Sequence, residues 1–179
     1  VETRAAAGQP PETGWLPDGS FTFLVRGRLP EVAWSHVLTN GQYGFLATDA
    51  GTGHMWLENA RENRINRWLN DPLAVRGTER LTLRRADGRE ISLFAAEDGY
   101  PCRVTWGFGF ARWEKTVDCR KISTTAFVPQ GVNARFFLIE TENLTSEDVI
   151  GYATDLVLGA DDRDETAVFT AFDGTVLTA

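Results

Sequence analysis

The feature that most constrains the fold of this 179-residue chain is a succession of short runs of β-favouring residues separated by turn sequences. No window shows a convincing amphipathic-helix period, and only Ala60–Leu69 could form one short helical turn. Turn sequences recur at intervals of roughly 8 to 15 residues, which is typical of antiparallel sandwiches and barrels. The sequence therefore predicts an all-β fold, an antiparallel β-sandwich.

The predicted strands share a high content of branched and aromatic residues. They are Phe21–Arg26, Tyr43–Thr48, His54–Leu57, Arg80–Leu83, Ile91–Phe94, Arg103–Trp106, Phe110–Val117, Lys121–Val128, Arg135–Thr141, Val149–Leu158, Val168–Phe172 and Thr175–Thr178. Asp87-Gly88 and Asp173-Gly174 lie between neighbouring runs, and Asp-Gly is a strong signal for a tight hairpin. Apolar and small residues alternate with period two along Lys121–Val128, as a half-buried strand requires.

The domain organisation follows from length and composition. A chain of this length is expected to form one domain and to bury a sizeable core. Residues 1–20 are rich in Gly, Pro and Ala and are predicted to be a loose lead-in, tied down at most by Trp15. Residues 21–179 are the predicted sandwich domain. The chain stops at Ala179 inside a strand pattern directly after a turn, so we expect a fragment truncated at its C-terminal end.

The two cysteines, Cys102 and Cys119, are too few for a disulfide framework. If a hairpin turns near Phe108, Cys102 falls opposite about Lys115, and Cys119 lies roughly four residues out of register, beyond the reach of a disulfide. We therefore expect two reduced thiols and a cytoplasmic setting. No secretory signal opens the sequence, and no apolar run approaches the ~20 residues of a membrane-spanning helix.

The charge pattern restricts the partners. The formal net charge is -7, and acidic and basic residues are mixed along the chain. Nucleic-acid partners select a basic stripe, and anionic membrane surfaces select basic clusters. The sequence therefore argues against both, whereas a neutral sugar would be indifferent to the net charge.

A loop rich in aromatic, Asn and Arg residues is the strongest functional signal. It follows Gly51-Thr52-Gly53 and contains Trp56, Asn59, Asn63, Arg64, Asn66, Arg67 and Trp68. Indole faces stack on sugar rings, and amide and guanidinium groups hydrogen-bond hydroxyl groups. We therefore predict a carbohydrate-facing loop. Its candidate substrate-binding residues are Trp56, Asn63, Arg64, Trp68 and Asp71. The alternative is a structural crossover in which Trp56 and Trp68 fill the core.

Catalytic and metal chemistry is not predicted from the residues present. His36 and His54 are the only histidines, and no cysteine lies near them, so a zinc site is disfavoured. Ser35, His36 and Asp49 do not make a Ser-His-Asp triad, because adjacent side chains on a strand point to opposite faces. The acidic run 161–165 lacks the alternating ligands and turn glycine of a hard-cation loop. Glycoside chemistry needs two facing carboxylates, and no pair stands out. The candidates by location are Asp49, Glu58, Glu62 and Asp71.

Several motifs in this chain resemble the start of glycoside hydrolase family 94. They are Trp34-Ser35, Asn40-Gly41-x-Tyr43-Gly44, Thr48-Asp49-Ala50-Gly51-x-Gly53, Glu62-Asn63-Arg64-x-x-x-Trp68-x-Asn70-Asp71-Pro72, Gly107-Phe108-Gly109-Phe110, Thr125-Ala126-Phe127-Val128-Pro129 and Leu138-x-x-Thr141-Glu142-Asn143. The resemblance runs from about residue 15 to residue 160. The family contains inverting cellobiose, chitobiose and β-1,2-oligoglucan phosphorylases and the phosphorylase-like region of cyclic β-1,2-glucan synthases. Trp56 and Trp68 look more like the β-1,2-glucan branch.

The resemblance implies a supersandwich-like N-terminal domain of a larger enzyme. A helical linker and an (α/α)₆ barrel would follow, and the barrel would supply the Asp that acts as general acid, so no catalytic residue is assigned here. Inorganic phosphate would be the co-substrate, with no cofactor and no metal. Family enzymes are commonly homodimers. The loop matching residues 51–71 would reach toward the sugar cleft, often that of the neighbouring subunit. The location would be cytoplasmic, or the cytoplasmic part of a membrane-bound synthase.

Two other functions compete with this interpretation. A free-standing carbohydrate-binding module would bind sugar as the isolated chain and would lose that binding on substitution of Trp56 or Trp68. An interaction or structural domain would use the aromatic loop to dock on protein, and it would dimerise without affinity for sugar.

Overall fold

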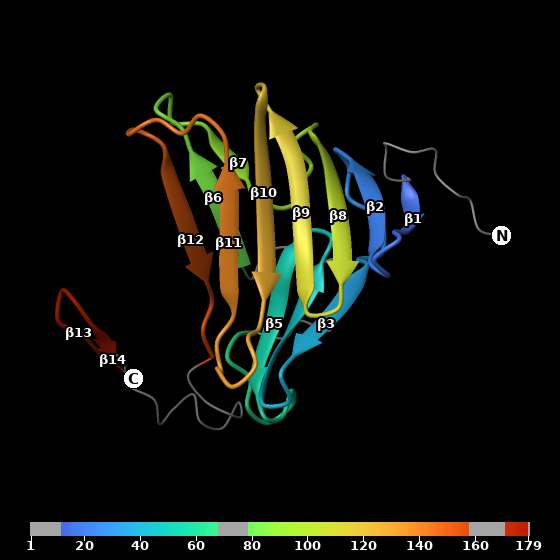
Figure 1. Cartoon of the computed structure of the whole chain (residues 1–179). Coiled ribbons are helices and arrows are strands. Elements are labelled where there is room, and N and C mark those ends of the chain that lie inside the picture. Colours follow the sequence, from blue (N-terminus) through green and yellow to red (C-terminus); the bar gives the residue numbers. More distant parts are fainter. Residues whose placement is uncertain (1–11, 68–78, 158–170, 179) are drawn as a thin grey trace.

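The computed structural model describes residues 12–67, 79–157 and 171–178, and every regular element in them is a β-strand (Figure 1). All strand pairs are antiparallel. The prediction of an all-β antiparallel sandwich is therefore confirmed. Among the described residues, a membrane-spanning helix is not found.

One layer of the sandwich is a six-stranded sheet. Its strands, in spatial order, are β1 (Thr13–Trp15), β2 (Phe21–Arg26), β8 (Pro101–Gly107), β9 (Phe110–Val117), β10 (Arg120–Phe127) and β11 (Phe136–Thr141). Strands β8 to β10 are joined by tight turns, the first at Phe108-Gly109 and the second at Asp118-Cys119. Strand β1 falls within the predicted lead-in, and the Trp15 ring meets Phe21 edge-on at 5.2 Å.

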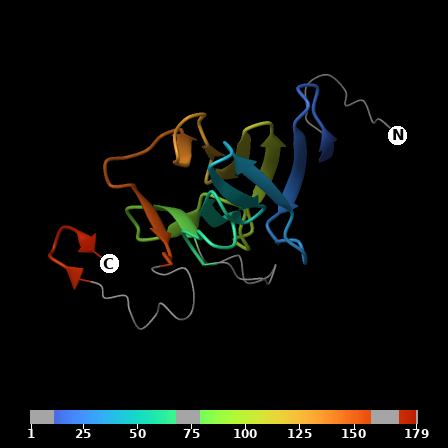
Figure 2. The same cartoon turned by 90° about the horizontal axis from the view of Figure 1, so that it is seen from below.

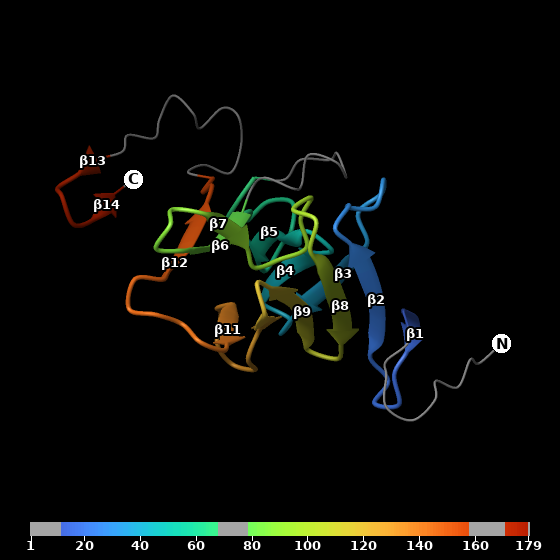
Figure 3. The same cartoon turned by 90° about the horizontal axis from the view of Figure 1, so that it is seen from above.

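Two three-stranded sheets form the opposite layer, as the views along the strands show (Figures 2 and 3). The first sheet contains β3 (Ser35–Thr39), β4 (Tyr43–Thr48) and β5 (Gly51–Leu57), in that order. The second has the order β12 (Val149–Thr154), β6 (Glu79–Arg84) and β7 (Glu90–Ser92). The short strands β13 (Ala171–Phe172) and β14 (Leu177–Thr178) pair with each other.

Local sequence signals located most of these strands. Strands β2, β4 and β9 begin and end at the predicted residues, and Asp87-Gly88 joins β6 to β7 in the predicted hairpin. Strand β3 was not predicted from the sequence. Its outward-facing Val37 is apolar, so the alternation between this exposed position and the inward-facing His36 and Leu38 is obscured. Strand β12 ends at Thr154, four residues before the predicted end.

The predicted pairing around the cysteines is confirmed. Cys102 lies opposite Lys115, and both Cys102 and Cys119 are free. Burial raises the pKa of the Cys102 thiol to about 12, so it behaves as an inert apolar side chain. A short helical turn was considered for Ala60–Leu69, and the described part of that segment, residues 60–67, contains a non-helical turn at 60–62.

The core lies between the two layers, and Trp113 of β9 lies near its centre. Its side chain is fully buried, and its ring meets Phe94 edge-on at 4.8 Å. The indole Nε1 donates to the backbone carbonyls of Thr48 at 3.1 Å and Asp49 at 2.9 Å. A buried indole N–H needs such partners, so Trp113 joins the large sheet to the turn between β4 and β5.

Two ion pairs also join the layers, and each contains at least one buried side chain. The Lys115 ammonium of β9 contacts Asp98 at 2.5 Å and donates to the carbonyls of Ser92 and Phe94. Arg135, just before β11, forms a bidentate pair with Glu79 of β6, in which the Nη1 to Oε2 distance is 2.9 Å. Since buried charges need a counter-charge and hydrogen bonds, these pairs restrict how the layers can pack.

Candidate functional site

The predicted carbohydrate-facing loop leaves β5 and folds back on it. We call residues 56–67, which are the last two residues of β5 and the segment that follows them, the β5 loop. The Leu57 amide donates to the Asn63 carbonyl at 3.0 Å, and the Ile65 amide donates to the Met55 carbonyl at 2.9 Å. Trp56 and Arg64 are partners in an isolated antiparallel bridge. The loop therefore presents its side chains from a backbone held against β5.

Two asparagines of this loop serve the fold. Asn66 is fully buried, and its side chain accepts from the Met55 amide at 2.6 Å and donates to the Gly53 carbonyl at 2.7 Å. The Asn59 carboxamide oxygen accepts from the amides of Arg61 and Glu62 at 2.8 Å and 3.1 Å, and so closes the turn. Their place in the sequence next to Trp56 suggested sugar contact, but the carboxamide oxygen of each accepts hydrogen bonds from backbone amides.

Trp56 lies on the face of β5 opposite Met55, as the alternation predicted, and is half-buried. Its ring stacks on His54 with centroids 5.3 Å apart, and it covers Gly44 of the neighbouring strand. A Cβ atom at position 44 would lie 2.4 Å from Trp56 Cζ2, so glycine is required there for the indole to lie flat. Met55 fills the core instead, with 5% of its surface exposed.

Asn63 and Arg64 complete the described part of the predicted site. Asn63 is exposed and Arg64 is half-buried. The structure brings these two residues and Trp56 together on one short loop. Trp68 and Asp71, the other two candidates, lie outside the described residues. The sugar contacts of all five residues remain a prediction.

The histidines take structural roles. His54 Nε2 is 2.8 Å from the Ala60 carbonyl, and burial lowers the pKa of its imidazole. His36 Nε2 is 3.1 Å from the Gly107 carbonyl, and its ring stacks on Trp106 with centroids 5.7 Å apart. His36 is therefore engaged with β8 through its Nε2 atom. No group of three or more His, Cys, Asp or Glu side chains in the described residues is arranged to hold a metal.

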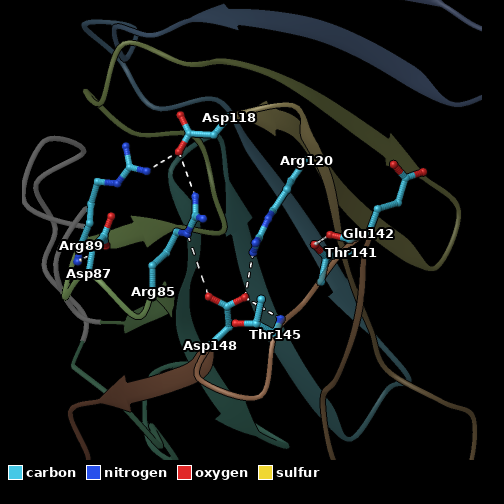
Figure 4. A network of polar contacts seen from close by, with 9 residues as sticks. All are labelled: Arg85, Asp87, Arg89, Asp118, Arg120, Thr141, Glu142, Thr145 and Asp148. Atoms are coloured by element: carbon cyan, nitrogen blue, oxygen red, sulfur yellow. Dashed lines mark hydrogen bonds and ion pairs between the residues drawn. The ribbon is translucent and has the colours of Figure 1, made fainter.

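A polar network lies where the β9–β10 turn meets the β6–β7 hairpin (Figure 4). Arg85 contacts Asp118 at 3.0 Å and Asp148 at 4.0 Å, and Arg120 contacts Asp148 at 2.8 Å. The Thr145 amide and the Arg120 guanidinium lower the pKa of Asp148 to about 2. This network could not be anticipated from the sequence, because its members come from three separate segments. Its charges are satisfied by one another, so it closes one end of the sandwich.

The fold and the β5 loop together define a two-layer β-sandwich domain with one aromatic, amide- and guanidinium-bearing loop. Residues 22–172 match the family described as Glycosyl hydrolase 94, supersandwich domain. This match covers most of the chain, and the protein belongs to that family. The resemblance proposed from the motifs is therefore confirmed.

A curated relative extends this comparison. The chain is 29% identical over 167 residues to the cyclic beta-(1,2)-glucan synthase NdvB of Rhizobium meliloti (strain 1021). The aligned region covers 87% of this chain and 6% of the relative. The chain therefore corresponds to one small part of a much longer protein, and it is similar to a region of an enzyme.

Proposed function

We propose that this chain is the N-terminal, carbohydrate-facing β-sandwich domain of an inverting glycoside phosphorylase or of a cyclic β-1,2-glucan synthase-like enzyme. The observation that carries the proposal is the family match over residues 22–172, combined with a β5 loop that presents Trp56, Asn63 and Arg64 together. The relative named as a glucan synthase supports the β-1,2-linked branch.

The β5 loop suits a sugar ligand because it combines a flat apolar surface with hydrogen-bonding groups. The Trp56 indole is backed by His54 and Gly44, so its orientation is set before a ligand arrives. The exposed Asn63 amide can both donate and accept, and the Arg64 guanidinium donates. The Asn66 anchor and the backbone bonds to β5 lower the ordering cost of binding.

In the parent enzyme, the chemistry would follow the inverting scheme with phosphate in place of water. A barrel Asp would protonate the glycosidic oxygen while inorganic phosphate attacks the opposite face of the sugar, giving α-glucose 1-phosphate and a shortened glucan. The present domain would hold the glucan, contact the (α/α)₆ barrel and contribute to a homodimer, in the cytoplasm. These contributions position the substrate rather than break bonds.

The test is a titration of the isotope-labelled 179-residue chain with β-1,2-linked gluco-oligosaccharides, followed by NMR, with cello-oligosaccharides as the comparison. We expect saturable shifts in the amides of residues 51–67 with the β-1,2 series. Trp56→Ala should abolish these shifts, whereas Trp15→Ala, which removes an indole that is 74% exposed outside the loop, should retain them.

A second variant keeps the test decisive if Trp56→Ala unfolds the domain. Asn63 is exposed, and its side chain makes no fold-stabilising contact that the structure describes, so Asn63→Ala should fold normally and weaken binding. The absence of shifts at millimolar sugar would contradict a sugar-binding role for this loop in the isolated domain. Shifts without a linkage preference would favour a general carbohydrate-binding module.

A further inference from the structure

The outer face of the six-stranded sheet carries a groove of about 970 Å³ over β8, β9, β10 and β11. We propose that this groove binds a neutral oligosaccharide chain at a site separate from the β5 loop. The class of ligand rests on the proposed function. The existence and chemistry of the groove rest on the residues that form it.

Strand pairing sets the arrangement of the groove. Alternation along β9 directs Glu114 outward and Lys115 inward. The register places Arg103, Glu114, Ser123 and Glu140 side by side across four strands. Neighbouring strands are roughly 4.8 Å apart, so these side chains form a continuous polar row. Such a row offers donors and acceptors at regular intervals on a rigid surface.

The charges of the groove balance. Seven charged side chains line the groove, and one of them, Lys115, points inward and is paired with Asp98. The other six are three basic and three acidic side chains, namely Arg103, Arg112, Lys121, Glu114, Glu140 and Glu142. The whole chain carries a formal net charge of -7, so this neutrality is local. A polyanion or a polycation would meet repulsion from half of these groups. A neutral polyhydroxyl chain can use both kinds, because each hydroxyl both donates and accepts.

Most of these charged groups are available to a ligand. Arg112, Lys121, Glu114 and Glu140 take part in no ion pair with the described residues, in contrast to the network in Figure 4. The Arg112 Nε donates to the Thr125 hydroxyl at 3.0 Å, which orients its guanidinium over the sheet. Four charged groups that form no ion pair among the described residues are consistent with a binding surface.

An aromatic row lies at one end of the same face. Phe110, Phe127 and Phe136 are aligned across β9, β10 and β11. The last two rings stack with centroids 5.8 Å apart, and Phe136 is 45% exposed. Phe110 is four residues before Glu114, which is about 14 Å along a strand. A sugar chain lying along β9 could therefore reach both the polar row and an apolar platform.

The test uses the full 179-residue chain and β-1,2-linked gluco-oligosaccharides of increasing length, again with residue-specific NMR shifts. We expect saturable shifts in the outward-facing residues of β9, β10 and β11, with affinity that rises with oligosaccharide length. Glu114→Gln and Arg112→Ala should each weaken groove binding roughly tenfold, as loss of a hydrogen bond to a charged group does. Glu90→Gln, on the exposed part of β7, is the matched control and should leave it unchanged.

The possible outcomes separate this inference from the proposed function. Shifts in residues 51–67 alone would support the β5 loop and overturn the groove, and the polar face would then be a surface for another domain. Shifts in the groove that survive Trp56→Ala but weaken with Glu114→Gln would support the groove as an independent site. The absence of shifts in both regions would overturn sugar binding at both sites.

Discussion

The two faces of β9 differ in how their charged side chains are stabilised. Lys115 points into the sandwich, is 4% exposed and is neutralised by Asp98. Its sequence neighbour Glu114 points outward into the groove and takes part in no ion pair with the described residues. A buried charge must be paired because desolvation is costly, whereas an exposed charge is stabilised by water. Burial therefore separates charges that hold the fold from charges that are free to meet a ligand.

The largest expected effect comes from Arg135→Met, which leaves Glu79 buried without its counter-ion. We expect a loss of about 3–5 kcal/mol in the free energy of unfolding at neutral pH, measured by urea denaturation. Arg84→Met, on the exposed side of β6, should change stability by less than about 0.5 kcal/mol. Equal losses in both variants would contradict a role for the buried pair.

The loss of stability in Arg135→Met should itself depend on pH. Burial raises the pKa of Glu79 above its ordinary value, while Arg135 lowers it. Removing Arg135 should raise this pKa further. A carboxyl group whose folded pKa exceeds its unfolded pKa binds more protons in the folded state, so the stability it contributes falls as pH rises. The deficit of the variant should therefore be smaller at pH 5 than at pH 7.

A smaller loss is expected for Lys115→Met. It removes the ammonium group that satisfies Asp98 and two backbone carbonyls. Asp98 retains some exposure to water, so we expect about 2–3 kcal/mol. The matched control is Lys121→Met, which removes an ammonium group from the exposed face of the sheet and should cost less than about 0.5 kcal/mol. If Lys121→Met lowers the free energy of unfolding as much as Lys115→Met does, the inward and outward charges do not differ in their contribution to stability.

The polar network at the end of the sandwich should contribute a pH-dependent stabilisation. We expect its size to lie between the effects of Lys115→Met and Glu114→Gln on the free energy of unfolding. The pKa of Asp148 is about 2, below its ordinary value of 3.8. Because this folded pKa is depressed, its contribution is present above about pH 4 and is lost as pH falls toward 2. Asp148→Asn should therefore flatten the stability curve between pH 4 and pH 2. Asp87→Asn is the control, and an unchanged curve in Asp148→Asn would contradict the assignment.

The smallest effect on stability is expected for Glu114→Gln in the groove. No described residue forms an ion pair with this carboxylate, so the free energy of unfolding should change by less than about 0.5 kcal/mol. Thermal and urea unfolding can both check this. A loss above about 1 kcal/mol would mean that the groove charges serve the fold.

Part of the candidate site could be predicted from sequence. The motif around Trp56 located the loop, because aromatic, Asn and Arg residues cluster there within a few positions. Which residues of the loop stabilise the fold and which remain exposed could not be predicted. Asn63 and Asn66 have the same side chain three positions apart, yet one is exposed and the other is buried against the backbone of β5. That difference depends on how the loop folds back.

The sequence by itself determined most of the strands and the β6–β7 hairpin, because these depend on neighbouring residues. Period-two alternation located β10, and Asp87-Gly88 specified the turn that joins β6 to β7. The tertiary structure decided which charges are paired. Arg135 meets Glu79 across 56 residues of chain, and the groove needs four strands in one register. Such contacts arise only when the two layers close, since burial and counter-charges are set by residues distant in sequence.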